Sequence, residues 1–287
     1  SQQAVKKDIN DTKVTVIQTQ KTVNAAVEKI ENNTIDLTDI KVGLEGTNNV
    51  LGYHEKDILA NSRNITTLNT KLDEWIKHPI LYPELKGKKG NVLGDSLTYG
   101  QGTTKTYWQY ICERHGIIGR NYGISGTCLS GVSNASGESM VTRYGKMSSD
   151  ADFITVFGGT NDFIQNMPLG TFSDREINTF YGALHVLIDG LITKYPTKGI
   201  LFITPFCFNR AKNSINLYVK DYVTAIKEVA EYYSIPVYDA YANSGLTTTN
   251  PTLQKIIVTS GGTVHVNEIG HLMLSKRLES FLLPLIL

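Results

Sequence analysis

Aliphatic residues recur at every seventh position along the first 78 residues of the chain, a stretch that contains no proline. Starting at Ile9, ten successive positions of this series are aliphatic. A heptad repeat keeps one seam of a helix facing a partner helix, so the pattern predicts a coiled-coil oligomerisation stalk over residues 1–78. The alternative is a polar helical linker whose periodicity is accidental.

The second layer of the predicted seam is more polar than a stable zipper needs, and it includes Thr12, Asn33 and His54. Polar layers fix the register of a coiled coil at a cost in stability, and β-branched residues in the aliphatic layer favour three chains somewhat over two. We therefore predict a homotrimer through residues 1–78. The three glycines between residues 43 and 52 each cost about 1 kcal/mol inside a helix, so we expect the coil to be interrupted there.

From residue 89 onwards, short apolar runs alternate with longer helical patterns. The apolar runs lie at 91–94, 152–159, 199–206 and 235–240, and the helical stretches lie at 106–116, 177–195, 217–234 and 269–283. Strands that are apolar on both faces and separated by helices are typical of a mostly parallel sheet covered by helices on each side. The pattern predicts a three-layer α/β/α domain over residues 89–287, joined to the stalk by a linker at 79–88.

Charge and cysteine content exclude several classes of function. The 28 Lys and Arg residues nearly balance the 27 Asp and Glu residues, so no net field favours nucleic acid or an anionic membrane surface. Three widely spaced cysteines without a CxxC pair argue against a disulfide framework and against a zinc site. No run of about 18 apolar residues is present, and we expect no insertion into a membrane.

Three polar motifs follow predicted strands or precede the last predicted helix: GDSLTYG at 94–100, GGTND at 158–162 and VHVNEIGH at 264–271. Ligands of open α/β sheets gather at the carboxyl ends of the strands, which would bring Ser96 and Asn161 to one rim. A serine hydroxyl needs a positioned base, and His265 or His271 could supply it. The Asn161 amide and nearby backbone N–H groups could stabilise an oxyanion, so the set indicates acyl transfer, unless Ser96 is only a turn residue.

These motifs, together with NYGISG at 121–126, resemble the four sequence blocks of the SGNH (GDSL) hydrolase superfamily. The resemblance covers residues 89–287 and implies a flavodoxin-like fold. It implies that Ser96 is the nucleophile and that His265 is the general base. It also implies that the oxyanion hole consists of the Ser96 N–H, Gly126 and the Asn161 side chain. We expect the reaction to need neither a metal nor a cofactor.

The sequence departs from the family pattern at one position, because Gly262 stands where the family places an aspartate three residues before the catalytic histidine. We hypothesise a Ser–His dyad in which a backbone carbonyl near residues 260–263 accepts the Nδ1–H of His265. Three aspartates could take the place of the acid only if the fold places them beside His265, namely Asp150, Asp152 and Asp162. Loss of the acid of a triad can cost about 10⁴ in turnover, so a domain that only binds is the alternative.

Residues 159–205 further resemble SGNH domains in tail fibre or baseplate proteins of bacteriophages and prophages of Gram-positive hosts. This resemblance implies a serine esterase that removes O-acetyl or similar acyl groups from a host surface polysaccharide, in contact with other tail proteins. Such a protein is made in the host cytoplasm and acts on the virion tail at the bacterial surface. The alternatives are a catalytically inactive receptor-binding head and a bacterial cell-wall or secreted carbohydrate esterase.

Aromatic residues near the motif loops are candidates for stacking on sugar rings, above all Tyr99 and Phe163. The alternative for each ring is packing in the core. The small polar loop at 129–139 is either a rim of the substrate cleft or a surface connection.

Overall fold

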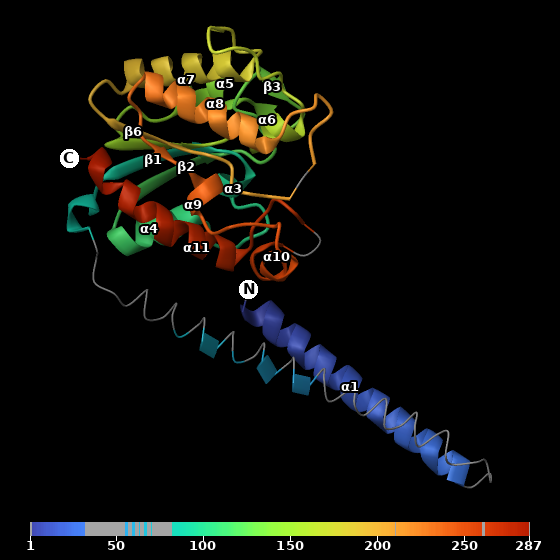
Figure 1. Cartoon of the computed structure of the whole chain (residues 1–287). Helices are drawn as coiled ribbons and strands as arrows, with labels where there is room; N and C mark the ends of the chain where they lie inside the picture. The colour runs from blue at the N-terminus through green and yellow to red at the C-terminus, as the bar shows by residue number, and fades with distance from the viewer. Residues whose placement is uncertain are drawn as a thin grey trace. The chain divides into compact units, whose positions relative to one another are not determined.

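Figure 1 shows the computed structural model of the chain, which describes residues 2–31, 55–56, 59–60, 63, 66–67, 70, 82–209, 211–259 and 262–286. The chain divides into two compact units, residues 1–79 and 80–287. Within the described ranges, no helix is both long and apolar enough to cross a membrane.

The N-terminal unit contains a helix of 30 residues, α1 (Gln2–Glu31). Threonine hydroxyls along it donate to the carbonyl four residues earlier, as at Thr12 and Thr19, so these polar side chains are satisfied by the helix itself. The interruption expected at 43–52 lies outside the described residues. The coiled coil and its trimeric state therefore stay predictions.

A five-stranded sheet forms the centre of the C-terminal unit. Its strands are β1 (Lys89–Gly94), β2 (Ile118–Gly123), β5 (Phe153–Phe157), β6 (Gly199–Ile203) and β7 (Val237–Tyr238). They lie in the order β2-β1-β5-β6-β7, and every neighbouring pair is parallel. This is the strand order of flavodoxin-like folds, whose ligands bind at the switch point between the two strands that correspond to β1 and β5.

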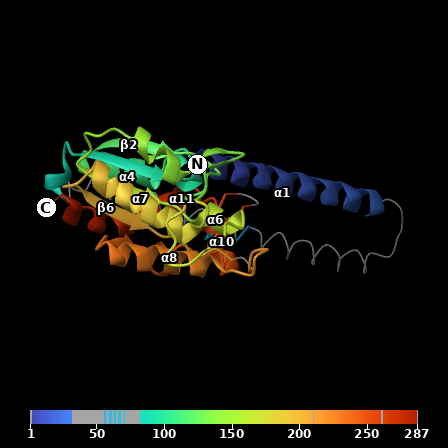
Figure 2. The ribbon, with the colours of Figure 1, turned by 90° about the horizontal axis from the view of Figure 1, so that it is seen from above.

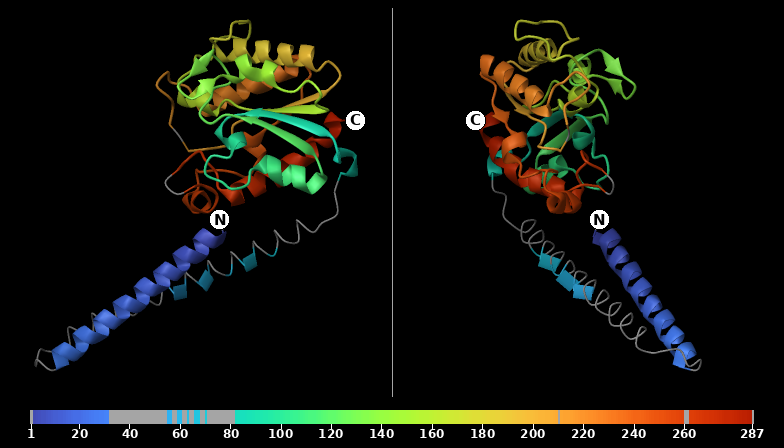
Figure 3. Two further views of the ribbon diagram at one scale, coloured as in Figure 1. Left: turned by 180° about the vertical axis from the view of Figure 1, so that it is seen from behind. Right: turned by 45° about the vertical axis from the view of Figure 1, so that its right-hand side comes forward.

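Helices cover both faces of the sheet (Figures 1 and 2). On one face, α7 (Phe180–Lys194) packs against α8 (Val219–Tyr232), and on the other face α4 (Tyr107–His115) packs against α11 (Glu268–Leu278). Figure 3 shows the same layers from behind and in an oblique view. The predicted three-layer α/β/α fold with a parallel sheet is confirmed.

The ends of α4 show how local sequence sets these elements. The Thr106 hydroxyl accepts the backbone N–H of Gln109 at 3.2 Å, and the Gln109 side chain accepts the backbone N–H of Thr106 at 2.8 Å. This reciprocal capping box satisfies two N–H groups at the start of the helix. Gly116 ends the helix with a φ of 67°, a left-handed conformation that glycine adopts without strain.

The remaining elements are short. The shorter helices are α3 (Ser96–Tyr99), α5 (Met140–Arg143), α6 (Thr160–Ile164), α9 (Ala240–Asn243) and α10 (Pro251–Ile257), with 3₁₀ turns at Pro83–Leu85, Tyr144–Lys146, Glu279–Phe281 and Leu283–Leu285. Strands β3 (Ser133–Asn134) and β4 (Gly137–Glu138) pair in an antiparallel hairpin. This hairpin occupies the polar loop predicted at 129–139, and the apolar pattern did not predict β2 or α10.

Candidate active site

Three neighbouring strands deliver the predicted site residues to one edge of the sheet. In the β1–β2 and β1–β5 pairs, Gly94 lies opposite Gly123 and opposite Phe157, so all three strands end at the same level. Ser96 follows β1, the loop with Gly126 follows β2, and Asn161 follows β5. The parallel register therefore brings together groups that are distant in the sequence.

Ser96 is the first residue of α3, directly after the turn at Asp95. The Asp95 carboxylate accepts the backbone N–H of Leu97 at 3.1 Å, which caps this short helix. Gly94 allows the turn to close, because a Cβ there would lie 2.1 Å from the Thr98 hydroxyl. The Ser96 side chain is consequently held at the sheet edge, where the residue is only 4% exposed.

The imidazole of His265 contacts the Ser96 hydroxyl, with 3.0 Å between Nε2 and Oγ. His265 lies in the connection between α10 and α11, and its carbonyl accepts the backbone N–H of Thr259 at 3.0 Å. Burial lowers the pKa of His265 below its ordinary value of 6.5, so the ring is neutral at neutral pH and able to accept a proton. The predicted pairing of nucleophile and base is present in the structure.

The second ring nitrogen of His265 has no hydrogen-bond partner among the described residues, which omit Ser260 and Gly261. The Gly262 carbonyl, one of the acceptors considered for it, instead accepts the Gln254 side chain at 3.3 Å. A Ser–His dyad whose Nδ1–H is held by a main-chain carbonyl stays a prediction for residues 260–263.

The three aspartates considered as substitute acids bind other groups. Asp150 forms an ion pair with the Lys89 ammonium at 2.8 Å, and Asp152 accepts the Lys89 backbone N–H at 2.8 Å, both at the opposite end of β1 from the nucleophile. Asp162 is buried and accepts two hydrogen bonds from Ser130, one from its backbone N–H at 2.9 Å and one from its side-chain hydroxyl. The fold therefore does not bring any of the three to His265.

Asn161 contacts the loop that carries Gly126, at the edge of the sheet where Ser96 lies. The Asn161 side-chain amide donates to the Thr127 carbonyl at 3.0 Å, and this leaves its second N–H for another acceptor. Gly126 has a φ of 77°, and the loop that carries it is tied to the nucleophile turn because the Ile124 N–H donates to the Gly94 carbonyl at 3.0 Å. These are suitable donors for a developing oxyanion.

The sequence analysis assigned no role to two buried ionisable residues that contact or adjoin the Ser96 turn, Arg143 and Asp95. The Arg143 guanidinium donates to the Gly94 carbonyl at 2.7 Å and also to the Tyr122 carbonyl, which fixes the ends of β1 and β2 together. Asp95 is 1% exposed, one of its carboxylate oxygens has no partner among the described residues, and burial raises its pKa to about 7. Arg143 belongs to no motif, so only the folded structure shows its role.

The structure distinguishes Tyr99 from Phe163, the two residues predicted to stack on sugars. It also distinguishes His265 from His271, the two candidate bases. Tyr99 is 59% exposed, whereas Phe163 is 2% exposed and packs edge-to-face against Phe208, so the expectation that Phe163 contacts substrate is corrected to a core role. His271 is fully buried, its Nδ1 accepts the backbone N–H of Tyr107 at 3.2 Å, and burial lowers its pKa to about 3. His271 is thus a packing residue, and His265, which contacts the Ser96 hydroxyl, stays the candidate base.

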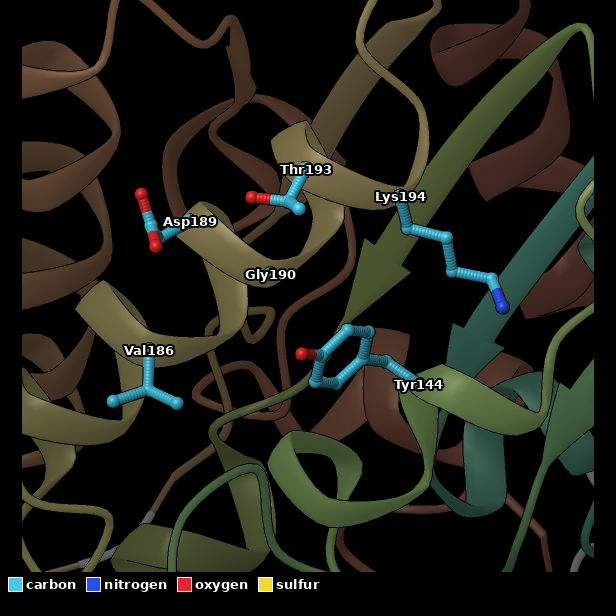
Figure 4. Close-up of a pocket in the computed structure, with 6 residues that line it drawn as sticks. All are labelled: Tyr144, Val186, Asp189, Gly190, Thr193 and Lys194. Atoms are coloured by element: carbon cyan, nitrogen blue, oxygen red, sulfur yellow. The ribbon is translucent and has the colours of Figure 1, made fainter.

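A shallow pocket of about 440 Å³ lies elsewhere on the domain (Figure 4). It is lined by Tyr144, Val186, Asp189, Gly190, Thr193 and Lys194. None of these residues belongs to the predicted site. In the part of the chain that the structure describes, no group of three His, Cys, Asp or Glu side chains is arranged to hold a metal ion.

Comparison with known proteins agrees with this geometry. Residues 92–273 match the GDSL-like lipase/acylhydrolase family, and the chain belongs to that family. A protein of known structure from Lactobacillus plantarum is 33% identical, with a TM-score of 0.65, over 70% of this chain and 99% of that one. Comparison with curated protein sequences gave no match.

Two more distant structures show the fold alone. A possible lipase from Chitinophaga pinensis is 19% identical, with a TM-score of 0.53, over 69% of this chain and 98% of that one. The aryl esterase of M. smegmatis is 13% identical, with a TM-score of 0.50, over 69% of this chain and 100% of that one. Both likenesses cover the α/β domain and carry no information about substrate.

Proposed function

We propose that this member of the GDSL-like family is a serine esterase that hydrolyses small acyl esters through Ser96 and His265. The contact of 3.0 Å between the Ser96 hydroxyl and the neutral His265 imidazole carries the proposal. His265 takes the hydroxyl proton as Oγ attacks the ester carbonyl. The N–H groups of Ser96, Gly126 and Asn161 hold the oxyanion, and the imidazolium then protonates the departing alcohol.

Water completes the cycle by attacking the acyl-serine with His265 again as the base. The imidazolium formed in each half of the reaction lacks a carboxylate partner among the described residues, so we propose a dyad that is slower than a triad with the same oxyanion hole. A main-chain acceptor for the Nδ1–H suffices to hold the ring in the tautomer that presents a lone pair at Nε2.

For the substrate, we propose small acyl groups, such as O-acetyl, on a polysaccharide of a bacterial surface. The exposed Tyr99 ring three residues after the nucleophile offers a surface for a sugar ring, which supports this choice. The heptad pattern of residues 1–78 and the resemblance of residues 159–205 support a place in a phage tail, on a trimeric stalk and beside other tail proteins. Several heads on one stalk would raise the avidity for a repeating polymer.

The proposed function predicts selective labelling of one serine. Diethyl p-nitrophenyl phosphate phosphorylates serines that are activated by a base, so we expect label on the peptide that contains Ser96, loss of p-nitrophenyl acetate hydrolysis in parallel, and no label on the exposed Ser214. Peptide mass spectrometry measures both. An unlabelled chain without hydrolysis would contradict the esterase and favour a receptor-binding head, which glycan-binding assays would then identify.

The pH dependence of the reaction follows from the burial of His265. Because burial lowers the pKa of His265 below its ordinary value, kcat/KM should fall as acid protonates the ring, through an apparent pKa under 6.5. Initial rates of ester hydrolysis measured from about pH 4.5 to about pH 8 give this profile. An acid limb centred above 6.5 would show that another group controls the reaction.

A further inference from the structure

The carbonyl of Gly126 accepts hydrogen bonds from two side-chain amides. Asn134, in the β3–β4 hairpin, donates its amide at 2.8 Å, and Gln165, directly after α6, donates its amide at 2.9 Å. The two side chains also contact each other, since the Asn134 amide donates to the Gln165 oxygen at 3.1 Å. Two elements that are distant in sequence therefore converge on one peptide group.

The orientation of both amides is set by further bonds. The Asn134 side-chain oxygen accepts the backbone N–H of Ser136 at 2.8 Å, which leaves its amide to face Gly126. The hairpin also packs directly on this glycine, because a Cβ at Gly126 would lie 2.3 Å from the Ser136 hydroxyl. Every amide N–H in this network faces an oxygen. Exchanging the oxygen and nitrogen of either side-chain amide would therefore place oxygen against oxygen and N–H against N–H.

Two side chains one helical turn apart, Asn161 in α6 and Gln165 directly after it, bind two successive carbonyls of the loop that carries Gly126. Asn161 binds the carbonyl of Thr127, and Gln165, four residues later, binds the carbonyl of Gly126; the Gln165 N–H in turn donates to the Asn161 carbonyl at 2.8 Å. Glycine lacks a Cβ and has wide conformational freedom, so the direction of the Gly126 N–H must be fixed from outside. Hydrogen bonds to the Gly126 and Thr127 carbonyls hold the chain on its carboxyl side, and the bond from the Ile124 N–H to the Gly94 carbonyl holds it on the amino side, so the Gly126 N–H is restrained between two anchored points.

We infer that Asn134 and Gln165 are positioning residues, which aim the Gly126 N–H at the oxyanion by holding the Gly126 carbonyl. The inference rests on the proposed esterase function and makes the small hairpin part of the catalytic apparatus. Neither side chain needs to touch the substrate. Their effect should therefore appear in the transition state, where negative charge develops on the ester oxygen, and not in the binding of the ground state.

The test compares wild type with Gln165→Met and Asn134→Asp, which remove the donated N–H groups while keeping side-chain length. We expect kcat for p-nitrophenyl acetate to fall about five- to tenfold in each variant, with KM changed less than about twofold. The affinity for phenylboronic acid, which forms a tetrahedral adduct with the nucleophilic serine, should fall by the same factor as kcat. Melting temperatures of all variants are measured alongside.

Asn166→Asp is the matched control for added negative charge, because the Asn166 side-chain oxygen accepts the Ser214 N–H at 2.8 Å, a bond that Asp can keep. It should retain wild-type kcat. Unchanged kcat and boronate affinity in Gln165→Met and Asn134→Asp would overturn the inference, as would an increase in KM alone. If wild type itself neither hydrolyses the ester nor binds the boronate, the esterase function fails first, so the two failures are distinct.

Discussion

Ser96→Ala is expected to lower kcat for p-nitrophenyl acetate by a factor on the order of 10⁴ while the domain stays folded. In the proposed mechanism the variant lacks the oxygen that forms the acyl-enzyme, and only the oxyanion donors remain to accelerate attack by water. Removal of the hydroxyl breaks one hydrogen bond, to His265, so the free energy of unfolding should change by no more than about 1 kcal/mol. Initial rates and thermal unfolding monitored by circular dichroism provide the measurements.

The control for this substitution is Ser214→Ala, which removes an exposed serine hydroxyl outside the site. It should keep full activity. Ser96→Ala activity within about tenfold of wild type would mean that another nucleophile carries the reaction, since a tenfold change corresponds to only about 1.4 kcal/mol of activation free energy.

Asn161→Ala carries the second largest expected effect, a loss in kcat of about 10²- to 10³-fold with KM little changed. The amide has one N–H on the Thr127 carbonyl and one free for the oxyanion, so the substitution removes both a catalytic donor and a bond that shapes the loop. Asn161→Asp has the same shape but offers an acceptor, with a negative charge, where the oxyanion develops. Its loss should be at least as large.

Steady-state kinetics of both Asn161 variants separate kcat from KM. An increase in KM at constant kcat would mean that Asn161 binds the substrate and its transition state equally. Equal melting temperatures of the Ala and Asp variants, combined with unequal kcat values, would assign the difference to charge at the oxyanion and not to the loop.

The apolar pattern predicted the buried strands of the sheet and β7 at one edge, but it missed β2 at the other edge and the short helix α10. Strand β5 is buried at every position and stood out as an apolar run, whereas β2 reads IGRNYG, lies at the edge of the sheet and is half exposed. Helix α10 was missed although its signals were present, namely Asn250 as the cap followed by Pro251 at the first helical position. β2 and α10 are mostly exposed or half-buried, and they bury too little surface to impose a regular apolar pattern.

The contact between Ser96 and His265, and the place of Asn161 directly after β5, were predictable because each residue belongs to a separate sequence motif. The site was not predictable where function depends on packing. Phe163 directly follows the GGTND motif and yet packs in the core, edge-to-face against Phe208 and Tyr222. Asn134 and Gln165 are ordinary polar residues in sequence, and only the closed fold brings both amides to the Gly126 carbonyl.

The lack of a carboxylate on His265, among the described residues, changes how charged molecules meet the site. The acid of a triad places a permanent negative charge below the imidazole, whereas the resting Ser96–His265 pair is uncharged. A like charge at roughly 8 Å repels by about 2 kcal/mol at an effective dielectric constant of about 20. Besides the buried Asp95 and Asp162 carboxyls, a dyad would place no further negative charge at the site, so we expect it to oppose phosphate- or carboxylate-bearing polymers less than a triad would.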